Sequence, residues 1–137
     1  MTATMPYKII STHRDRVSTV EFWNNGMIYI KIDDNCEIGI EDSRALYNFL
    51  LLKFNGKNKH RVLVNPGRYT EISKEARGFS QRPETNEMTL ATAVLVNSLA
   101  HRIVINFIIS VIHQQTMKMK MFDKRKKAIE WLLAQGD

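Results

Sequence analysis

Residues 89–113 read TLATAVLVNSLAHRIVINFIISVIH, and this stretch decides the fold. Its first part, Thr89 to Val96, is a nearly continuous β-prone run, which is typical of a buried strand. Ser98 can then cap a helix that extends to about His113, since the length of the apolar run favours a helix over a second strand. A strand that leads directly into a helix predicts an α/β fold with largely parallel pairing.

Upstream of this stretch, two strand candidates at residues 17–23 and 27–32 flank the sequence NNG at residues 24–26, a strong hairpin signal. A two-residue turn would mix polar and apolar side chains on one face. A three-residue loop with the glycine at positive φ instead sets Phe22 opposite Ile28 and makes one face apolar. We therefore predict the three-residue loop.

The remaining elements alternate between helices and strands. Alternation of this kind implies right-handed crossovers, so we predict one α/β domain with a mixed, mostly parallel five-stranded sheet, an N-terminal β-hairpin and about four helices. Residues 15–137 form this domain, and residues 1–14 are either a flexible tail or an added strand. The other predicted elements are a helix at 41–54, a buried strand at 61–65, a short helix at 73–81, an edge strand at 116–122 and a last helix capped by Asp123.

The composition restricts the class of protein. The chain has 137 residues, of which 44% are hydrophobic and 25% charged, as in one ordinary globular domain. Cys36 is the single cysteine, so no intrachain disulfide can form, and we expect a reducing, cytoplasmic setting. Residues 1–6 lack the pattern of a secretory signal. The apolar run at 99–112 is shorter than the about 20 residues of a transmembrane helix.

With this order of elements, the chain resembles the STAS-like domains, which share the fold of bacterial anti-sigma-factor antagonists (SpoIIAA-like). The resemblance covers about residues 15–135. It is strongest at Ala93 to Ser98 (AVLVNS), with the apolar helix behind it, and at Met121 to Leu133 (MFDKRKKAIEWLL). These stretches are similar to an uncharacterised bacterial branch of the group. The resemblance implies a non-enzymatic regulatory or protein-interaction domain.

In the well-understood members, the turn between the third strand and the second helix holds a serine whose phosphorylation controls partner binding. That serine commonly follows an Asp and precedes a Gly. Ser73 is the nearest equivalent, but Ile72 precedes it and Lys74 follows it. The resemblance thus makes Ser73 a candidate regulatory residue, whereas the favoured explanation is that this serine only caps the short helix.

The helix at Leu99 to Ile112 is apolar around most of its circumference, so it must be buried on more than one side. Two covers for its second side remain open. The helix could form the interface of a homodimer, or Trp131 and Leu132 of the last helix could cover it. The candidate dimer or ligand surface consists of Ile105, Ile108, Ile109 and Ile112.

A second hypothesis is a carrier or sensor of a lipid or small hydrophobic ligand, since some relatives of this fold bind hydrophobic molecules between helix and sheet. Methionine also fills irregular gaps in ordinary hydrophobic cores, so the side chains proposed to line such a pocket could instead be ordinary core residues. The side chains that could line such a pocket are Phe107, Met117, Met119 and Met121.

Basic charge is the one compositional bias, with 20 Lys and Arg against 14 Asp and Glu and a formal net charge of +6. Many of the basic residues are clustered near the C-terminal end of the sequence. Such a cluster could bind phosphates or anionic lipids, or it could be an ordinary solvated face. No recognised nucleic-acid motif accompanies it, so we do not expect nucleic-acid binding. The candidate anion or partner patch is Lys118, Lys120, Lys124, Arg125, Lys126 and Lys127.

The sequence offers no set of residues for catalysis or metal binding. No nucleophile-elbow pattern surrounds a serine, and Cys36 has no evident base nearby. The acidic residues at 33–37 lack the spacing of a calcium loop, and residues 65–68 (NPGR) supply only one glycine for a phosphate loop. The four histidines, His13, His60, His101 and His113, are scattered without ligand spacing. We predict no enzyme activity, no metal and no cofactor.

Overall fold

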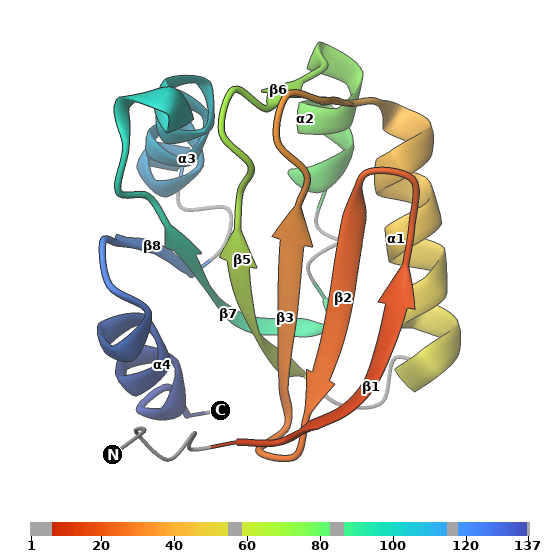
Figure 1. Cartoon of the computed structure of the whole chain (residues 1–137), viewed down its shortest axis with the longest axis vertical. Helices are drawn as coiled ribbons and strands as arrows, with labels where there is room; N and C mark the ends of the chain where they lie inside the picture. Colours follow the sequence, from red (N-terminus) through yellow and green to blue (C-terminus); the bar gives the residue numbers. More distant parts are fainter. Residues whose placement is uncertain (1–6, 55–58, 83–86, 115–117, 137) are drawn as a thin grey trace.

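The computed structural model describes residues 7–54, 59–82, 87–114 and 118–136 (Figure 1). They form an α/β domain with a mixed sheet of order β1-β2-β3-β5-β7-β8 and a small parallel pair, β4-β6, which confirms the predicted fold class. The strands are β1 (Ile9–Arg14), β2 (Ser18–Trp23), β3 (Met27–Ile32), β4 (Glu37–Ile38), β5 (His60–Asn65), β6 (Glu71–Ile72), β7 (Thr89–Leu95) and β8 (Met119–Phe122). The helices are α1 (Ile40–Phe54), α2 (Lys74–Ser80), α3 (Arg102–Gln114), which follows a 3₁₀ turn at Leu99–His101, and α4 (Arg125–Leu133).

The β2–β3 hairpin has the predicted three-residue loop. Phe22 lies opposite Ile28, and Gly26 has a φ of 86°. The backbone N–H of Gly26 donates to the carbonyl of Trp23 at 3.1 Å. The prediction is confirmed because only this loop length places the apolar side chains of both strands on one face.

A sixth strand, β1, pairs antiparallel with the outer edge of β2. Its alternate residues face the helical layer, where the ring of His13 stacks on Phe49 of α1 with centroids 3.6 Å apart. Ile9 and Ile10 at its start are exposed. The strand has little apolar content, so pairing with β2 rather than burial of its side chains holds it in place.

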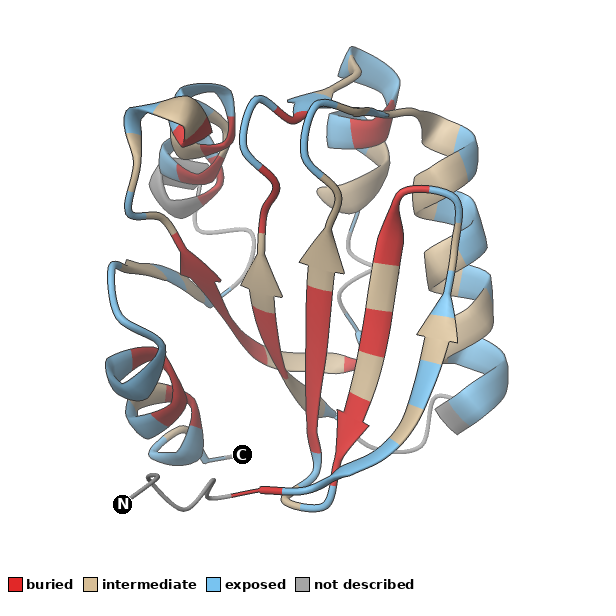
Figure 2. Ribbon diagram, viewed as in Figure 1, coloured by how far each residue is buried: buried red, intermediate tan, exposed pale blue. Residues whose placement is uncertain are grey.

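From β3 onward the strands β3, β5, β7 and β8 are parallel and succeed one another across the sheet. The three crossovers run in one direction and are right-handed by rule, so α1, α2 and α3 lie on one face. On that face Ile28, Val62 and Val94 are buried against the helices. Figure 2 shows continuous buried stretches, in red, along β3 and β7. Tyr29 and Leu63, which alternate with them, are buried on the other face.

The last helix, α4, covers the face opposite to α3. Its buried residue Leu132 belongs to the cluster around Leu63, and Trp131 packs against Phe122 with ring centroids 5.6 Å apart. The suggestion that Trp131 and Leu132 cover α3 is therefore wrong. Without α4 the second face of the sheet would be bare, which is the physical reason for its position.

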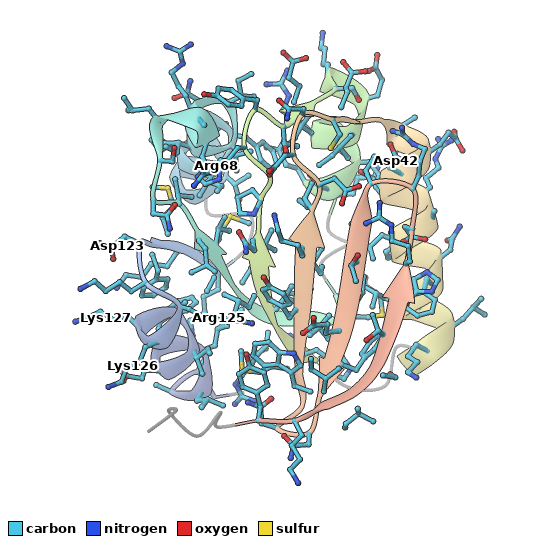
Figure 3. All side chains as sticks on the ribbon, in the orientation of Figure 1. Asp42, Arg68, Asp123, Arg125, Lys126 and Lys127 are labelled. Atoms are coloured by element: carbon cyan, nitrogen blue, oxygen red, sulfur yellow. The ribbon has the colours of Figure 1, made fainter. Side chains whose placement is uncertain are left out.

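The helix α4 also starts differently from the prediction. Its N-cap is Lys124, whose side chain makes no capping hydrogen bond, so the predicted cap at Asp123 is wrong. The first helical residue is Arg125. Its guanidinium carbon lies over three buried rings, which we call the aromatic group: Tyr29 at 4.7 Å, Trp23 at 5.3 Å and Tyr7 at 5.7 Å. Figure 3 shows Arg125 pointing toward the sheet, whereas Lys126 and Lys127 point away from it.

Candidate ligand-binding cavity

The short helix α2 lies above the sheet without filling the space beneath it. Ser73 caps the helix, since its Oγ accepts a hydrogen bond from the N–H of Ala76 at 3.1 Å. Ala76 is the buried residue of α2, and its small side chain lines the space between the helix and the sheet. The helix packs mainly on α1, where the rings of Tyr47 and Phe79 meet edge to face at 5.8 Å. A gap therefore remains between α2, α3 and the sheet.

This gap contains a cavity of about 190 Å³, which we call the first hollow. Its wall is mostly apolar and combines residues of the main sheet and of the β4-β6 pair with residues of α1, α2 and α3. The polar side chains in the wall are Ser18, Asp42, Ser43 and Ser80. Its apolar side chains include Ile30, Val64, Val94, Leu46, Phe107 and Met119.

A second hollow of about 230 Å³ lies beneath α1 and the end of α2. Its own wall includes Val62, Phe79, Met88 and His60. The two hollows adjoin, and each alone is smaller than the roughly 300 to 1,000 Å³ of typical ligand pockets, so a ligand of typical size would have to span both. The wall residues that they share are Ile30, Ser43, Leu46, Val64 and Ser80.

The charged side chain in the wall of the first hollow is Asp42, in the first turn of α1 (Figure 3). Its carboxylate accepts hydrogen bonds from Arg16 Nε at 2.8 Å, from Arg16 Nη2 at 2.6 Å and from the backbone N–H of Gly39 at 2.9 Å. The bond from Arg16 is the main cause that lowers the pKa of Asp42, so this carboxylate is ionised at neutral pH.

The second hollow includes a histidine in its wall. Burial lowers the pKa of His60, because the charged imidazolium would lose its hydration there. His60 is therefore neutral at pH 7. Both hollows thus lack a positive charge among the described residues that line them.

The comparisons with known proteins identify the family. The model of the family described as "Domain of unknown function (DUF7793)" matches residues 22–135. The chain belongs to this family. Among solved structures, an uncharacterised protein of the DUF3478 family with a SpoIIAA-like fold from Shewanella loihica PV-4 is similar, with a TM-score of 0.55 and 13% identity. The similarity covers 96% of this chain and 98% of that chain. No curated protein matches. The DUF7793 chain therefore has the predicted SpoIIAA-like fold.

Two of the four residues predicted to line a pocket lie in the cavity of this DUF7793 chain. Phe107 and Met119 both line the first hollow. Met121 packs against the core beneath α3 and borders a shallow surface depression next to Ile105. Met117 lies outside the described residues. The wall residues Asp42 and Ser43 were missed, since their sequence signal is that of an ordinary helix start.

The predicted surface on α3 is split by the packing of the helix. Ile108 is 2% exposed and lines the first hollow, so it belongs to the core rather than to a docking surface. Ile105 is half-buried, and Ile109 is 46% exposed. The side chain of Ile112 lies outside the described residues. The outward face of α3 is instead continued by Leu99 and Ile103, which are exposed.

The predicted basic patch keeps five of its six members. Lys118, Lys120, Lys124, Lys126 and Lys127 are exposed. Arg125 is also exposed, but its guanidinium is engaged by the aromatic group. Among the ion pairs within the described ranges, none involves these six residues. Lys120 Nζ lies 5.4 Å from the ring centroid of Phe122. The role of these lysines as an anion or partner patch stays a prediction.

The acidic residues after β3 connect the loop that follows β3 to the loop that follows β5. The carboxylate of Asp33 pairs with Arg14, and its backbone carbonyl accepts hydrogen bonds from Thr70 Oγ1 at 2.9 Å and Cys36 Sγ at 3.2 Å. Burial raises the pKa of the Cys36 thiol, which is therefore not a thiolate at neutral pH. Gly67 allows the approach, because a Cβ there would lie 1.9 Å from the Asp33 carbonyl oxygen. These residues hold the loops at the ends of β3 and β5.

Two features are absent from the described part of the chain. Its His, Cys, Asp and Glu side chains form no group of three or more that could hold a metal ion. None of its helices combines the length and the apolar character needed to cross a bilayer.

Proposed function

We propose that this domain binds a small apolar molecule between its helical layer and its sheet, and acts as a non-catalytic carrier or sensor of that molecule. The observation that carries the proposal is the pair of adjoining hollows with mostly apolar walls. Protein interiors are normally packed as densely as organic crystals, so adjoining spaces of this size are a place for a ligand. An apolar ligand there would gain about 25 cal/mol for each Å² removed from water.

A cavity-filling variant tests this function. Ala76→Leu extends the side chain of α2 toward the first hollow, whereas Ala45→Leu adds the same atoms at an exposed position of α1 and serves as the control. The probe is N-phenyl-1-naphthylamine, a neutral dye whose fluorescence rises in apolar sites. We expect wild type and Ala45→Leu to bind the dye and Ala76→Leu to bind it at least about tenfold more weakly. Equal binding by all three proteins contradicts the proposal, and native mass spectrometry of freshly purified protein shows whether a small molecule co-purifies.

A second function, self-association as a homodimer, is favoured by the outward face of α3. Leu99 is 90% exposed, Ile103 41% and Ile109 46%, and apolar side chains gathered on one helix often mark an interface. This function agrees with the regulatory or protein-interaction domain that the STAS-like resemblance implies. Light scattering with Ile109→Asp and, as control, Asn48→Asp at an exposed position of α1 tests it. A wild-type monomer at high concentration contradicts the dimer.

A further inference from the structure

The charge in the described wall of the first hollow is negative. Asp42 is ionised, its side chain is only 13% exposed, and it lines the first hollow while it pairs with the exposed guanidinium of Arg16. The neighbouring hydroxyl of Ser43 lines both hollows. The described wall residues include no Lys or Arg.

The nearest cation is already committed. Arg16 donates two hydrogen bonds to Asp42, and its Nη2 also donates to the backbone carbonyl of Glu37 at 2.9 Å. Arg16 itself lines neither hollow. An anionic head group in the cavity would therefore be buried beside a carboxylate without a cation of its own.

A hydroxyl head group faces a different situation. A carboxylate offers about four acceptor positions, and three are used by Arg16 and the Gly39 N–H. The fourth position on Asp42 can accept one O–H from a ligand, and the Ser43 hydroxyl can donate or accept. An uncharged chain that ends in a hydroxyl thus satisfies both the apolar and the polar parts of the wall.

From this arrangement we propose that the cavity selects uncharged aliphatic alcohols and rejects carboxylates of the same chain length. The proposal rests on the proposed function, because it names the class of ligand for the same cavity. Asp42 sets the selectivity, through repulsion of an anionic head group and acceptance of a hydroxyl proton.

The experiment compares 1-octanol with octanoate as competitors of the neutral dye at pH 8. We expect wild type to bind 1-octanol at least about tenfold more tightly than octanoate. In Asp42→Asn the preference should shrink several-fold, because the amide removes the charge while its oxygen can still accept from Gly39. The control is Asp33→Asn, which removes an Arg-paired carboxylate that does not line the hollows and should leave the preference unchanged.

A second measurement needs no variant. If only the uncharged acid enters, the apparent affinity for octanoate falls about tenfold from pH 7 to pH 8, because the acid fraction falls by that factor. Asp42 is already ionised and His60 already neutral over this range, so neither contributes. Octanoate binding that equals 1-octanol binding or is independent of pH overturns the selectivity and leaves the apolar cavity standing. Failure of the dye and of both octyl ligands to bind refutes the cavity function and the selectivity together.

Discussion

Replacement of Arg125 by methionine should destabilise the domain more than the same replacement of its neighbour Lys126. The two residues are consecutive in the first turn of α4, but only Arg125 lies over the aromatic group. Methionine keeps an unbranched side chain of similar length and removes the charge. The pair of variants therefore isolates the contact with the rings.

The magnitude follows from two opposing contributions. A cation over an aromatic ring contributes about 0.5 to 1 kcal/mol at exposed sites and about 2 kcal/mol or more when desolvated. The three rings are buried while Arg125 itself is exposed, and they share one cation, so we expect about 1 to 2 kcal/mol for the whole contact. Removal of a positive charge from the first turn should increase the free energy of unfolding by about 0.3 to 1 kcal/mol in both variants, because cations interact unfavourably with the helix dipole there. Arg125→Met should thus be about 1 to 2 kcal/mol less stable than Lys126→Met.

Urea unfolding followed by circular dichroism measures this difference directly. Tryptophan fluorescence adds a local signal, since Trp23 belongs to the aromatic group. The midpoint of thermal unfolding should be lower in Arg125→Met than in Lys126→Met by roughly 3 to 6 °C for a domain of this size. Equal free energies of unfolding for the two variants would refute the stabilising role of the ring contact.

Three further outcomes follow from the geometry. Gly67→Ala should cost at least about 3 kcal/mol in urea unfolding, because its Cβ would overlap a backbone carbonyl, whereas Gly78→Ala, with no atom within 4 Å of the added carbon, should be neutral or stabilising. Burial lowers the pKa of both His60 and His101, so the unfolded chain binds more protons than the folded one. The free energy of unfolding should therefore fall as the pH drops below about 6.5, and a flat profile between pH 8 and 5.5 would contradict this. Ser73→Ala should lose about 1 kcal/mol through the missing cap, while Ser73→Asp keeps a capping oxygen and its stability. An altered partner affinity in Ser73→Asp alone would indicate regulation.

The register of the β2–β3 hairpin was predictable because two local signals agree. The glycine at position 26 permits the positive φ of the loop, and the alternation of apolar residues excludes the other loop length. The position of α4 was not predicted, because an apolar stripe shows that a helix is buried but not which surface buries it. The one-directional order of the parallel strands decides that, since it places all three crossover helices on one face.

The sequence predicted a ligand site between the helices and the sheet, but not its exact wall. Phe107 and Met119 do line it, but its existence depends on how far α2 stands from the sheet. The sequence KEARGFS of α2 contains a clue, since a single small residue, Ala76, faces inward. The contact of Arg125 with Tyr7 and Tyr29 leaves no local signal, because these partners are far apart along the chain.

The aromatic group also constrains the order in which the molecule can assemble. Tyr7, the first described residue, stacks on Trp23 with ring centroids 3.4 Å apart, and Arg125 reaches both rings from the last helix. During translation, Tyr7 and Trp23 are synthesised about a hundred residues before Arg125. Until α4 emerges, Leu63 and Met27 remain uncovered on their side of the sheet. Before that point the nascent chain exposes a hydrophobic surface that chaperones can bind. The final folding step therefore comes after synthesis of α4.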